Sequence, residues 1–241
     1  MFSYNAYIGS MYFSKASSSS ITNSSFVDSI TRLSGGCLYL GTSSDVVIDN
    51  VMLSNCSTTR SDGGAIYASS LISVVFGNST ISNSFAFGHG GGIAVASSSD
   101  FLVHRSLFES NTANYGGAGI YVTYAERFMV SAVSLITNTA LYFGGGLMVD
   151  KLSEDVKISN ITAEGNTANW GGAIYVGVRH TNVDILNGLF YDNRAFTGGG
   201  GAVVIDTANT GVVVDYCMFD GNIAVNGGAL HFNTENPSVH V

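Results

Sequence analysis

A glycine-rich tetrapeptide recurs along the chain at an almost constant interval. Each copy places a small residue and then an aliphatic one after a glycine pair, which is Gly-Ala in a single copy. Successive copies begin 28, 27, 27, 27, 27, 29 and 27 residues apart. A period of this length is typical of a solenoid of stacked coils. The copies begin at Gly35, Gly63, Gly90, Gly117, Gly144, Gly171, Gly200 and Gly227, and a degenerate copy, Gly9-Ser10-Met11-Tyr12, precedes them.

A second marker, an asparagine, falls in the other half of each unit. We predict that these residues form a structural ladder at a bend, with each side-chain amide bonded to backbone or to the amide of the next coil. Asparagine also tolerates the left-handed backbone conformation that tight corners need. The predicted ladder comprises Asn55, Asn83, Asn111, Asn138, Asn166, Asn193 and Asn222.

The segments between the markers alternate in polarity and are rich in β-branched and aromatic residues, as at 74–76 and 212–214. This pattern predicts strands rather than helices. A unit so short holds no helical crossover, so its strands can be parallel only if the chain itself winds. We therefore predict an all-β, right-handed parallel β-helix (solenoid) with coils of about 27 residues. About nine coils would form a single domain over residues 1–241, on the order of 40 Å long.

Two columns of aliphatic residues are predicted to face the inside of the solenoid. They are the third and fifth residues after each first glycine, which share one face of a strand because side chains alternate. The residue before the first column is always Cys, Ala or Gly. Stacked inner side chains should therefore supply most of the stability. The third-residue column is Leu38, Ile66, Ile93, Ile120, Leu147, Ile174, Val203 and Leu230, and the fifth-residue column is Leu40, Ala68, Val95, Val122, Val149, Val176, Ile205 and Phe232.

The charge of the chain limits its partners. Nine Lys and Arg against 17 Asp and Glu give a net charge of −8, so clustered cations for nucleic acid or anionic lipid are lacking. No apolar stretch predicts a transmembrane segment, and residues 1–20 do not resemble a signal peptide. The three cysteines show no metal-ligand spacing, and we expect buried free thiols. No cofactor is predicted. The cysteines are Cys37, Cys56 and Cys217.

The combination of a Gly-Gly-Ala-Ile/Leu motif with Phe-x-x-Asn once per coil resembles the repeats of the chlamydial polymorphic membrane proteins and related outer-membrane-type repeat proteins. Phe-x-x-Asn stands at 108–111, 190–193 and 219–222, and Asp28 holds the matching place in the first unit. In other coils Met52, Thr80, Leu135 or Ala163 replaces the phenylalanine, and we expect no C-terminal outer-membrane barrel within residues 1–241. The resemblance covers Gly9 to Phe232.

This resemblance implies that the chain is the passenger of a secreted autotransporter. Several members of that family act as adhesins. The chain would then be extracellular or on the cell surface, associated with the outer membrane if bacterial. We also expect a piece of a longer protein, because coils begin at once and end soon after Phe232 without caps. Bare terminal coils would favour end-to-end self-association.

A column of tyrosines is the candidate binding surface. It occupies the fourth position after the first glycine, which points outward, and it includes Ala94, Met148, Val204 and His231 in other coils. Stacked tyrosines could bind a cell-surface protein or a glycan, since they offer rigid amphipathic area. Alternatively, aromatic neighbours simply stabilise the sheet. The tyrosines are Tyr39, Tyr67, Tyr121 and Tyr175.

Acidic residues begin the second strand of four coils. They could form a calcium site, or they could be solvated turn residues that discourage sheet association. The calcium-binding nonapeptide pattern is missing. Four sequons also permit N-glycosylation in a eukaryotic secreted protein. The acids are Asp45, Asp100, Glu126 and Asp155, and the sequons begin at Asn23, Asn55, Asn78 and Asn160. Asn55 also belongs to the predicted ladder, which argues against its glycosylation.

A polysaccharide-cleaving enzyme, pectate lyase-like or polygalacturonase-like, is the alternative function. Gly88-His89-Gly90 matches a polygalacturonase motif, but the Asn-Thr-Asp and Asp-Asp motifs that supply paired carboxylates do not occur. The basic pair at 104–105 with Asp100 and Arg127 is the only loose lyase constellation. We therefore predict no catalytic residue and favour a non-catalytic surface scaffold for adhesion or partner recognition.

Overall fold

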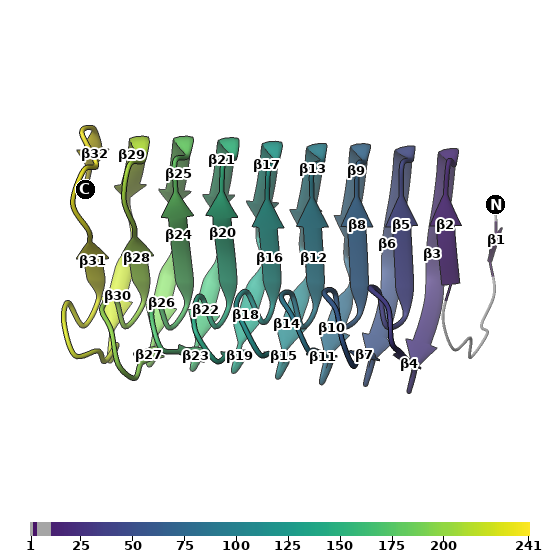
Figure 1. The fold of residues 1–241 in the computed structure, drawn as a ribbon, viewed down its shortest axis with the longest axis horizontal. Helices are drawn as coiled ribbons and strands as arrows, with labels where there is room; N and C mark the ends of the chain where they lie inside the picture. The colour runs from purple at the N-terminus through teal and green to yellow at the C-terminus, as the bar shows by residue number, and fades with distance from the viewer. Residues whose placement is uncertain (1, 4–10) are drawn as a thin grey trace.

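The computed structural model describes residues 2–3 and 11–241. Its strands wind into coils that stand side by side along one axis, with β2 near one end and β31 near the other (Figure 1). Every strand pair between named elements is parallel, and from β2 onwards partners lie one coil apart. The described residues form no helix, and in that part of the chain nothing qualifies as a membrane-spanning helix. The predicted all-β parallel solenoid is confirmed.

The first sheet carries the residues that follow each glycine pair. It contains nine strands, each hydrogen-bonded to its equivalents in the neighbouring coils. In order they are β2 (Met11–Ser14), β5 (Leu38–Gly41), β8 (Ile66–Ser69), β12 (Ile93–Ala96), β16 (Ile120–Thr123), β20 (Leu147–Lys151), β24 (Ile174–Val178), β28 (Val203–Ile205) and β31 (Leu230–Phe232).

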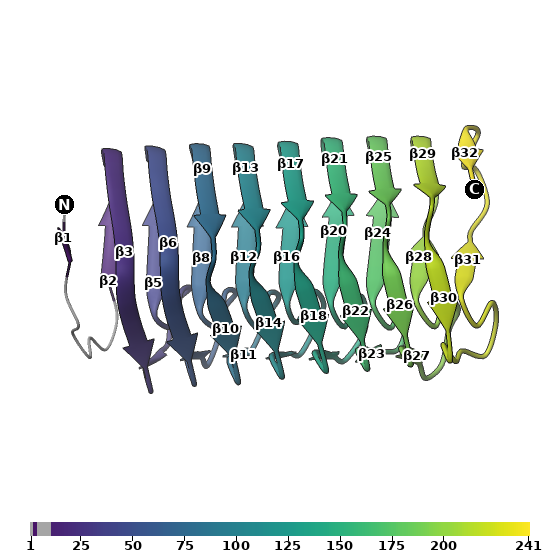
Figure 2. The ribbon, with the colours of Figure 1, turned by 180° about the vertical axis from the view of Figure 1, so that it is seen from behind.

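The second sheet has two wings that meet at one long strand, β6 (Ser44–Ser54), with β3 (Ser17–Val27) beside it and β1 (Phe2–Ser3) beyond (Figure 2). In later coils a bend divides this strand in two. One wing is β9 (Ile72–Gly77), β13 (Ser99–His104), β17 (Glu126–Ser131), β21 (Glu154–Ser159), β25 (Thr181–Leu186), β29 (Thr210–Asp215) and β32 (Val239–His240), and the other is β10 (Thr80–Ser82), β14 (Leu107–Glu109), β18 (Ser134–Ile136), β22 (Thr162–Glu164), β26 (Leu189–Tyr191) and β30 (Met218–Asp220).

The third sheet is made of two-residue strands after the second bend of each coil. The chain then crosses a loop to the next glycine pair. The strands are β4 (Ile30–Thr31), β7 (Ser57–Thr58), β11 (Phe85–Ala86), β15 (Thr112–Ala113), β19 (Thr139–Ala140), β23 (Thr167–Ala168) and β27 (Arg194–Ala195).

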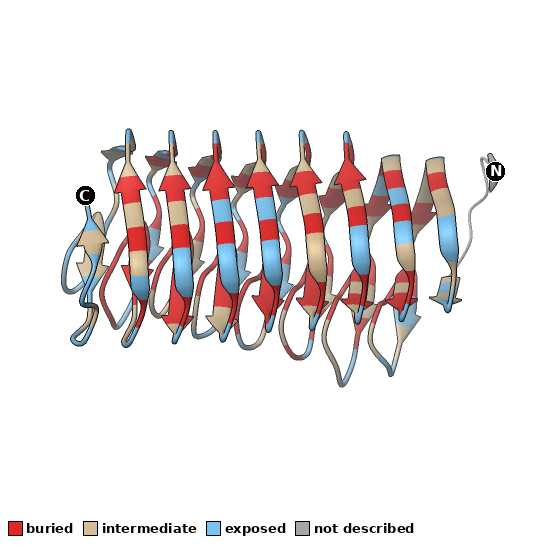
Figure 3. Ribbon diagram, turned by 90° about the horizontal axis from the view of Figure 1, so that it is seen from above, coloured by how far each residue is buried: buried red, intermediate tan, exposed pale blue. Residues whose placement is uncertain are grey.

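The core runs along the axis as columns of equivalent side chains. Ile93 pairs with Ile66 on one side and Ile120 on the other, as the repeat predicts. Both predicted aliphatic columns are buried except in the last coil, where Leu230 and Phe232 are partly exposed. Buried and exposed residues alternate along the strands (Figure 3), because successive side chains point to opposite faces.

The glycine pair has two separate steric roles, seen at Gly171 and Gly172. Gly171 has φ of 61°, in the left-handed region that suits glycine. A Cβ on Gly172 would collide with the carbonyl oxygen of Gly201 and with the backbone of Arg194. The first glycine therefore turns the chain, and the second lets neighbouring coils approach.

The degenerate first copy is shifted by one residue from its predicted alignment. Met11 pairs with Leu38 and Tyr12 with Tyr39. The alignment of Gly9 with Gly35 was therefore wrong, although Gly9 and Ser10 themselves lie outside the described residues.

The asparagine ladder exists in five of the seven predicted coils. Asn138 is representative: its Oδ1 accepts from the backbone N–H and side-chain amide of Asn111, and its own amide donates to the carbonyl of Phe108 and to Oδ1 of Asn166. All but the last member are fully buried, and in those four both amide hydrogens have partners. The last member, Asn222, donates to the carbonyl of Phe190. The asparagine ladder consists of Asn111, Asn138, Asn166, Asn193 and Asn222.

Asn55 and Asn83 were wrongly placed in this ladder. Both are exposed and left-handed, with φ of 54° and 52°, and each precedes the true ladder position. That position holds Cys56 and Ser84 in these two coils. The backbone N–H of Cys56 donates to the hydroxyl of Ser84, and the backbone N–H of Ser84 donates to Oδ1 of Asn111. The phenylalanine position is shifted likewise, because Phe108 aligns with Ile81 and Leu53, so Met52 and Thr80 were misassigned.

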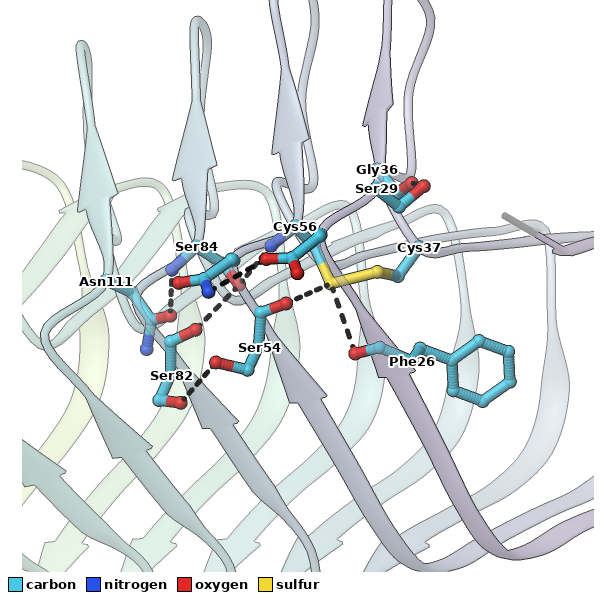
Figure 4. Close-up of a disulfide and its surroundings, with 11 residues drawn as sticks. Phe26, Ser29, Gly36, Cys37, Ser54, Cys56, Ser82, Ser84 and Asn111 are labelled. Carbon is cyan, nitrogen blue, oxygen red and sulfur yellow. Dashed lines mark hydrogen bonds between the residues drawn. A yellow bond between two sulfur atoms is a disulfide. The ribbon is translucent and has the colours of Figure 1, made fainter. Parts of the chain in front are cut away.

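The cysteine prediction was also wrong for two of the three residues. Cys37 and Cys56 form a disulfide across the interior of one coil (Figure 4). Cys217 is free. Cys56 occupies the ladder column, which faces the small residue after the glycine pair, and Cys37 is that small residue. In a later coil Gly119 faces Asn138 in the same way.

Two further polar columns line the other bends. In one, the Ser79 hydroxyl accepts from the backbone N–H of Val51, and the Ser106 hydroxyl accepts from Ser79. In the other, Nδ1 of His180 accepts a hydrogen bond from the backbone N–H of Ser153, and Oδ1 of Asn209 accepts one from the backbone N–H of His180. In each coil the column residue comes directly after a residue with a left-handed backbone. At all three bends an inward polar side chain therefore accepts a hydrogen bond from the backbone N–H of the equivalent residue in the preceding coil.

Candidate functional site

The outward tyrosine column divides into an open part and a covered part. Tyr12, Tyr39 and Tyr67 stack on the outer face of the first sheet with ring centroids 4.6 and 5.5 Å apart. Tyr12 is 72% exposed, and the other two are half-buried. Rings stacked at strand spacing present edges and hydroxyl groups to solvent rather than faces. Burial and the neighbouring tyrosines raise the pKa of Tyr39.

Tyr121 and Tyr175 are buried, so the expectation that they form an open surface was wrong. Each is only 7% exposed, within a second apolar cluster outside the first sheet. The Tyr121 hydroxyl donates to Asp150 at 2.8 Å, and the Tyr175 hydroxyl donates to Asp206. Burial and these carboxylates raise the pKa of both tyrosines above the ordinary value. Both hydroxyls therefore serve as fixed, neutral donors.

Residues just before the glycine pair cover these tyrosines from the preceding coil. His89 stacks on Tyr121 at 4.3 Å, and Phe143 packs on Tyr175 at 4.6 Å. In the coil where Gly116 precedes the glycine pair, the sulfur of Met148 fills the space that a side chain at 116 would occupy. A Cβ on Gly116 would collide with that sulfur. The second apolar layer is thus interlocked coil by coil, and we name it the outer cluster. It comprises Ala94, Tyr121, Met148, Tyr175 and Val204, with Tyr67, Phe143 and Trp170 packed against it.

A row of exposed large apolar side chains lies beside the outer cluster, at the corner where the third sheet ends. These residues follow β11, β15, β19 and β27, which are members of one sheet, so they share one corner of the solenoid. Ring contacts join them to the layer beneath: Tyr115 packs against His89, and Tyr142 against Phe143. We name this row the aromatic corner. It consists of Phe87, Tyr115, Leu141, Tyr142 and Phe196, which are 46, 48, 52, 42 and 51% exposed.

The aromatic corner was missed by the sequence analysis. The rings of Tyr115 and Tyr142 are tilted against each other with centroids 5.8 Å apart, and the Arg194 guanidinium lies 5.0 Å from the ring centroid of Phe196. Exposed apolar groups on a rigid support are typical of surfaces that bind protein or sugar. The available sequence signal was the aromatic residue two places before the glycine pair in two successive coils.

Comparison with known proteins places the chain in a family. The sequence matches the family described as "Right handed beta helix region" over residues 64–240. The chain belongs to the right-handed β-helix family. No curated protein matches this β-helix. Among solved structures it is similar to PfbA, a surface adhesin of Streptococcus pneumoniae, at 10% identity and a TM-score of 0.31, covering 88% of this chain and 84% of that chain. So low a TM-score supports no functional inference.

The acids proposed as a calcium ladder are not stacked on one another in the β-helix. Asp45, Asp100 and Asp155 do share one left-handed column, but Arg127 stands between the last two in that column, and Glu126 lies outside it. Arg127 donates to both carboxylate oxygens of Asp100 at 2.6 and 2.9 Å, which lowers the pKa of Asp100. Residues 11–241 contain no group of three or more His, Cys, Asp or Glu side chains that could hold a metal ion.

The loose lyase constellation is divided between the two ends of β13. Asp100 and Arg127 pair with each other near its start, whereas His104 lies near its end, about 13 Å away at the usual strand rise. His89, of the polygalacturonase-like motif, is committed to packing: its backbone N–H donates to Asp62 and its ring lies between Tyr115 and Tyr121. Burial lowers its pKa, against the opposing charges of Asp62 and Asp150, and its Nδ1 has no hydrogen-bond partner.

All four sequon asparagines lie on exposed bends of the β-helix. Asn23, Asn78 and Asn160 share one left-handed column between the two wings of the second sheet. Asn55 lies on the next bend and donates to Asp28 at 3.0 Å rather than joining the asparagine ladder. The structural objection to its glycosylation therefore disappears.

Proposed function

We propose that this β-helix is a non-catalytic scaffold that binds a protein or glycan partner through the aromatic corner. The observation that carries the proposal is the row of five half-exposed apolar side chains, which come from the coils of β11, β15, β19 and β27, with Asn169 following β23 in the coil between the last two. Rings held from below need little ordering on binding, so their contact area contributes to affinity at low entropic cost. Arg194, which lies over the ring of Phe196, is a single cation, whereas nucleic acid would require clustered cations.

An extracellular or cell-surface location is part of the same proposal. The Cys37–Cys56 disulfide supports it, because such bonds persist in oxidising compartments. The Gly-Gly-Ala-Ile/Leu and Phe-x-x-Asn repeats add the resemblance to polymorphic outer-membrane-type passengers, in which adhesion is a common role. End-to-end self-association of coils stays a prediction.

Polysaccharide cleavage is the alternative function. It is tested by incubating the protein with polygalacturonate and other uronates. Release of reducing ends would report hydrolysis, and the absorbance of unsaturated products would report lyase activity. Turnover by the wild-type protein that exceeds a heat-denatured control would replace the scaffold proposal.

The binding proposal is tested with purified protein on a glycan array and on a panel of immobilised extracellular-matrix proteins. We expect the wild type to bind at least one ligand, and the triple variant Tyr115→Ser, Tyr142→Ser, Phe196→Ser to lose about tenfold or more of that affinity. A wild type that binds nothing on either panel would overturn the proposal.

A matched control removes exposed apolar side chains elsewhere. Tyr124, Tyr216 and Met218 are 47, 81 and 48% exposed and lie away from the aromatic corner. Replacing all three by serine should leave binding unchanged. The pair Tyr39→Ser, Tyr67→Ser tests the tyrosine surface predicted from sequence. Loss of binding in that pair alone would move the site to the stacked tyrosines.

A further inference from the structure

A shallow basic groove lies on the outer face of the second sheet, where β13, β17 and β21 end. Its volume is about 580 Å³. A second hollow of about 490 Å³ shares Arg105 and Ala132 with it and continues towards β10 and β14. The principal lining residues of the basic groove are Leu102, His104, Arg105, Met129, Ala132 and Lys157.

Small side chains leave this hollow open, among them Ala132, Ser131 and Ser159. Arg105 and Ala132 follow one another in a left-handed column, with φ of 45 and 54°, so the short side chain of Ala132 leaves a gap beside the long side chain of Arg105. On the next strand Gly77 lies beneath the imidazole of His104, where any Cβ would collide with the ring. The groove therefore follows from the side-chain sizes in two adjacent columns.

The charge of the groove is opposite to that of the chain as a whole. Only nine Lys and Arg stand against 17 acids, yet Arg105 and Lys157 both line this depression. Within the described residues, neither forms an ion pair, whereas Arg127 and Lys151 do. The acid next to the groove on this face is Asp184, the register partner of Lys157.

The floor between these cations is apolar. Leu102 is half-buried and Met129 is 40% exposed, and they are register partners on β13 and β17. A guanidinium fork matches the two oxygens of a carboxylate or sulfate, and an ammonium supplies a second point charge. The apolar floor matches the C–H face of a pyranose ring. A ligand that carries an anionic group on a sugar satisfies both features.

We propose that the basic groove binds the carboxylate or sulfate groups of an acidic polysaccharide. Arg105 and Lys157 contact the anionic groups, His104 donates a hydrogen bond, and Leu102 and Met129 support the sugar ring. The groove lies on a different sheet from the aromatic corner, so this second site is independent of the proposed function above.

The test measures the binding of heparin, which is sulfated, of polygalacturonate, which is carboxylated, and of neutral dextran and single-stranded DNA. We expect the wild type to bind at least one acidic polysaccharide at low ionic strength, and to bind dextran and DNA at least about tenfold more weakly. The double variant Arg105→Asn, Lys157→Gln should lose about fivefold or more of the polysaccharide affinity. Asparagine suits the left-handed backbone at 105, so the variant should fold.

Arg179→Asn is the matched control, because Arg179 is also exposed and left-handed, with φ of 61°, and lies outside the groove. Its affinity should stay within about twofold of wild type. Three results would overturn the proposal: no binding to either acidic polysaccharide, equal binding to single-stranded DNA, or a smaller loss than fivefold in the double variant. The aromatic-corner triple variant should keep this binding, which separates the two sites.

Discussion

Oδ1 of Asn138 accepts hydrogen bonds from both the backbone N–H and the side-chain amide of Asn111, which lies 27 residues earlier and one coil away. Both donors are fully buried, and the same pair of bonds links each later member to the next. The asparagine ladder therefore stabilises the stack of coils as well as the bend within each coil.

Replacing Asn138 by alanine should lower the free energy of unfolding by about 3 kcal/mol, because the N–H of Asn111 and the carbonyl of Phe108 lose buried partners worth about 1–3 kcal/mol each. The same change at Asn83 removes only a residue that favours a left-handed backbone, and should cost about 1 kcal/mol. Urea denaturation followed by circular dichroism measures both. Equal costs would mean that the ladder bonds add nothing beyond local conformation.

Reduction of the Cys37–Cys56 disulfide, which closes a loop with a sequence separation of 19, should lower the unfolding free energy by about 3 kcal/mol. Thiol titration in denaturant should find one reactive group, Cys217, before reduction and all three cysteines after it. Cys217→Ser should leave the disulfide and its effect on stability unchanged. Three reactive thiols in the unreduced protein would show that the bond does not form.

Leu152 is half exposed and has a left-handed backbone with φ of 50°, which is unfavourable for a branched side chain. Leu152→Asn should therefore raise the unfolding free energy by about 1 kcal/mol. Leu189→Asn is the control, since Leu189 is 38% exposed but lies in a regular strand. Stabilisation by the control as well would mean that the gain comes from removing an exposed apolar side chain rather than from relieving backbone strain.

His180 should make stability depend on pH. Its burial lowers its pKa below the ordinary value, and its Nδ1 must stay unprotonated to accept from Ser153. The unfolded chain then binds more protons below about pH 6.5, so the unfolding free energy is fully present above that pH and falls as the pH drops.

The variant His180→Asn keeps an acceptor of the kind that Asn209 supplies in the next coil, and it removes the titration. Between about pH 7.5 and pH 5, the wild type should lose about 1 kcal/mol more than the variant. His89, whose pKa is also lowered, is present in both proteins and cancels in the difference. Parallel pH profiles would contradict the role of His180.

Misassignment of the first ladder positions has a clear physical cause. A bend of this kind needs a left-handed residue followed by an inward polar residue, and asparagine suits both positions. Asn83 takes the first position in its coil, whereas Asn111 takes the second in the next. Sequence spacing alone cannot distinguish positions one residue apart, and the same shift hid Cys56 in the ladder column opposite Cys37.

The sequence by itself determined the winding, the coil length and the inner aliphatic columns, because a fixed repeat and two-residue alternation follow from local backbone geometry. Only the tertiary structure decided which outward residues meet solvent. Alternation says that Tyr121 points away from the core, but the ring that covers it belongs to His89 of the preceding coil. The disulfide, the aromatic corner and the basic groove likewise depend on side-chain sizes in neighbouring coils, which become adjacent only when the chain has wound.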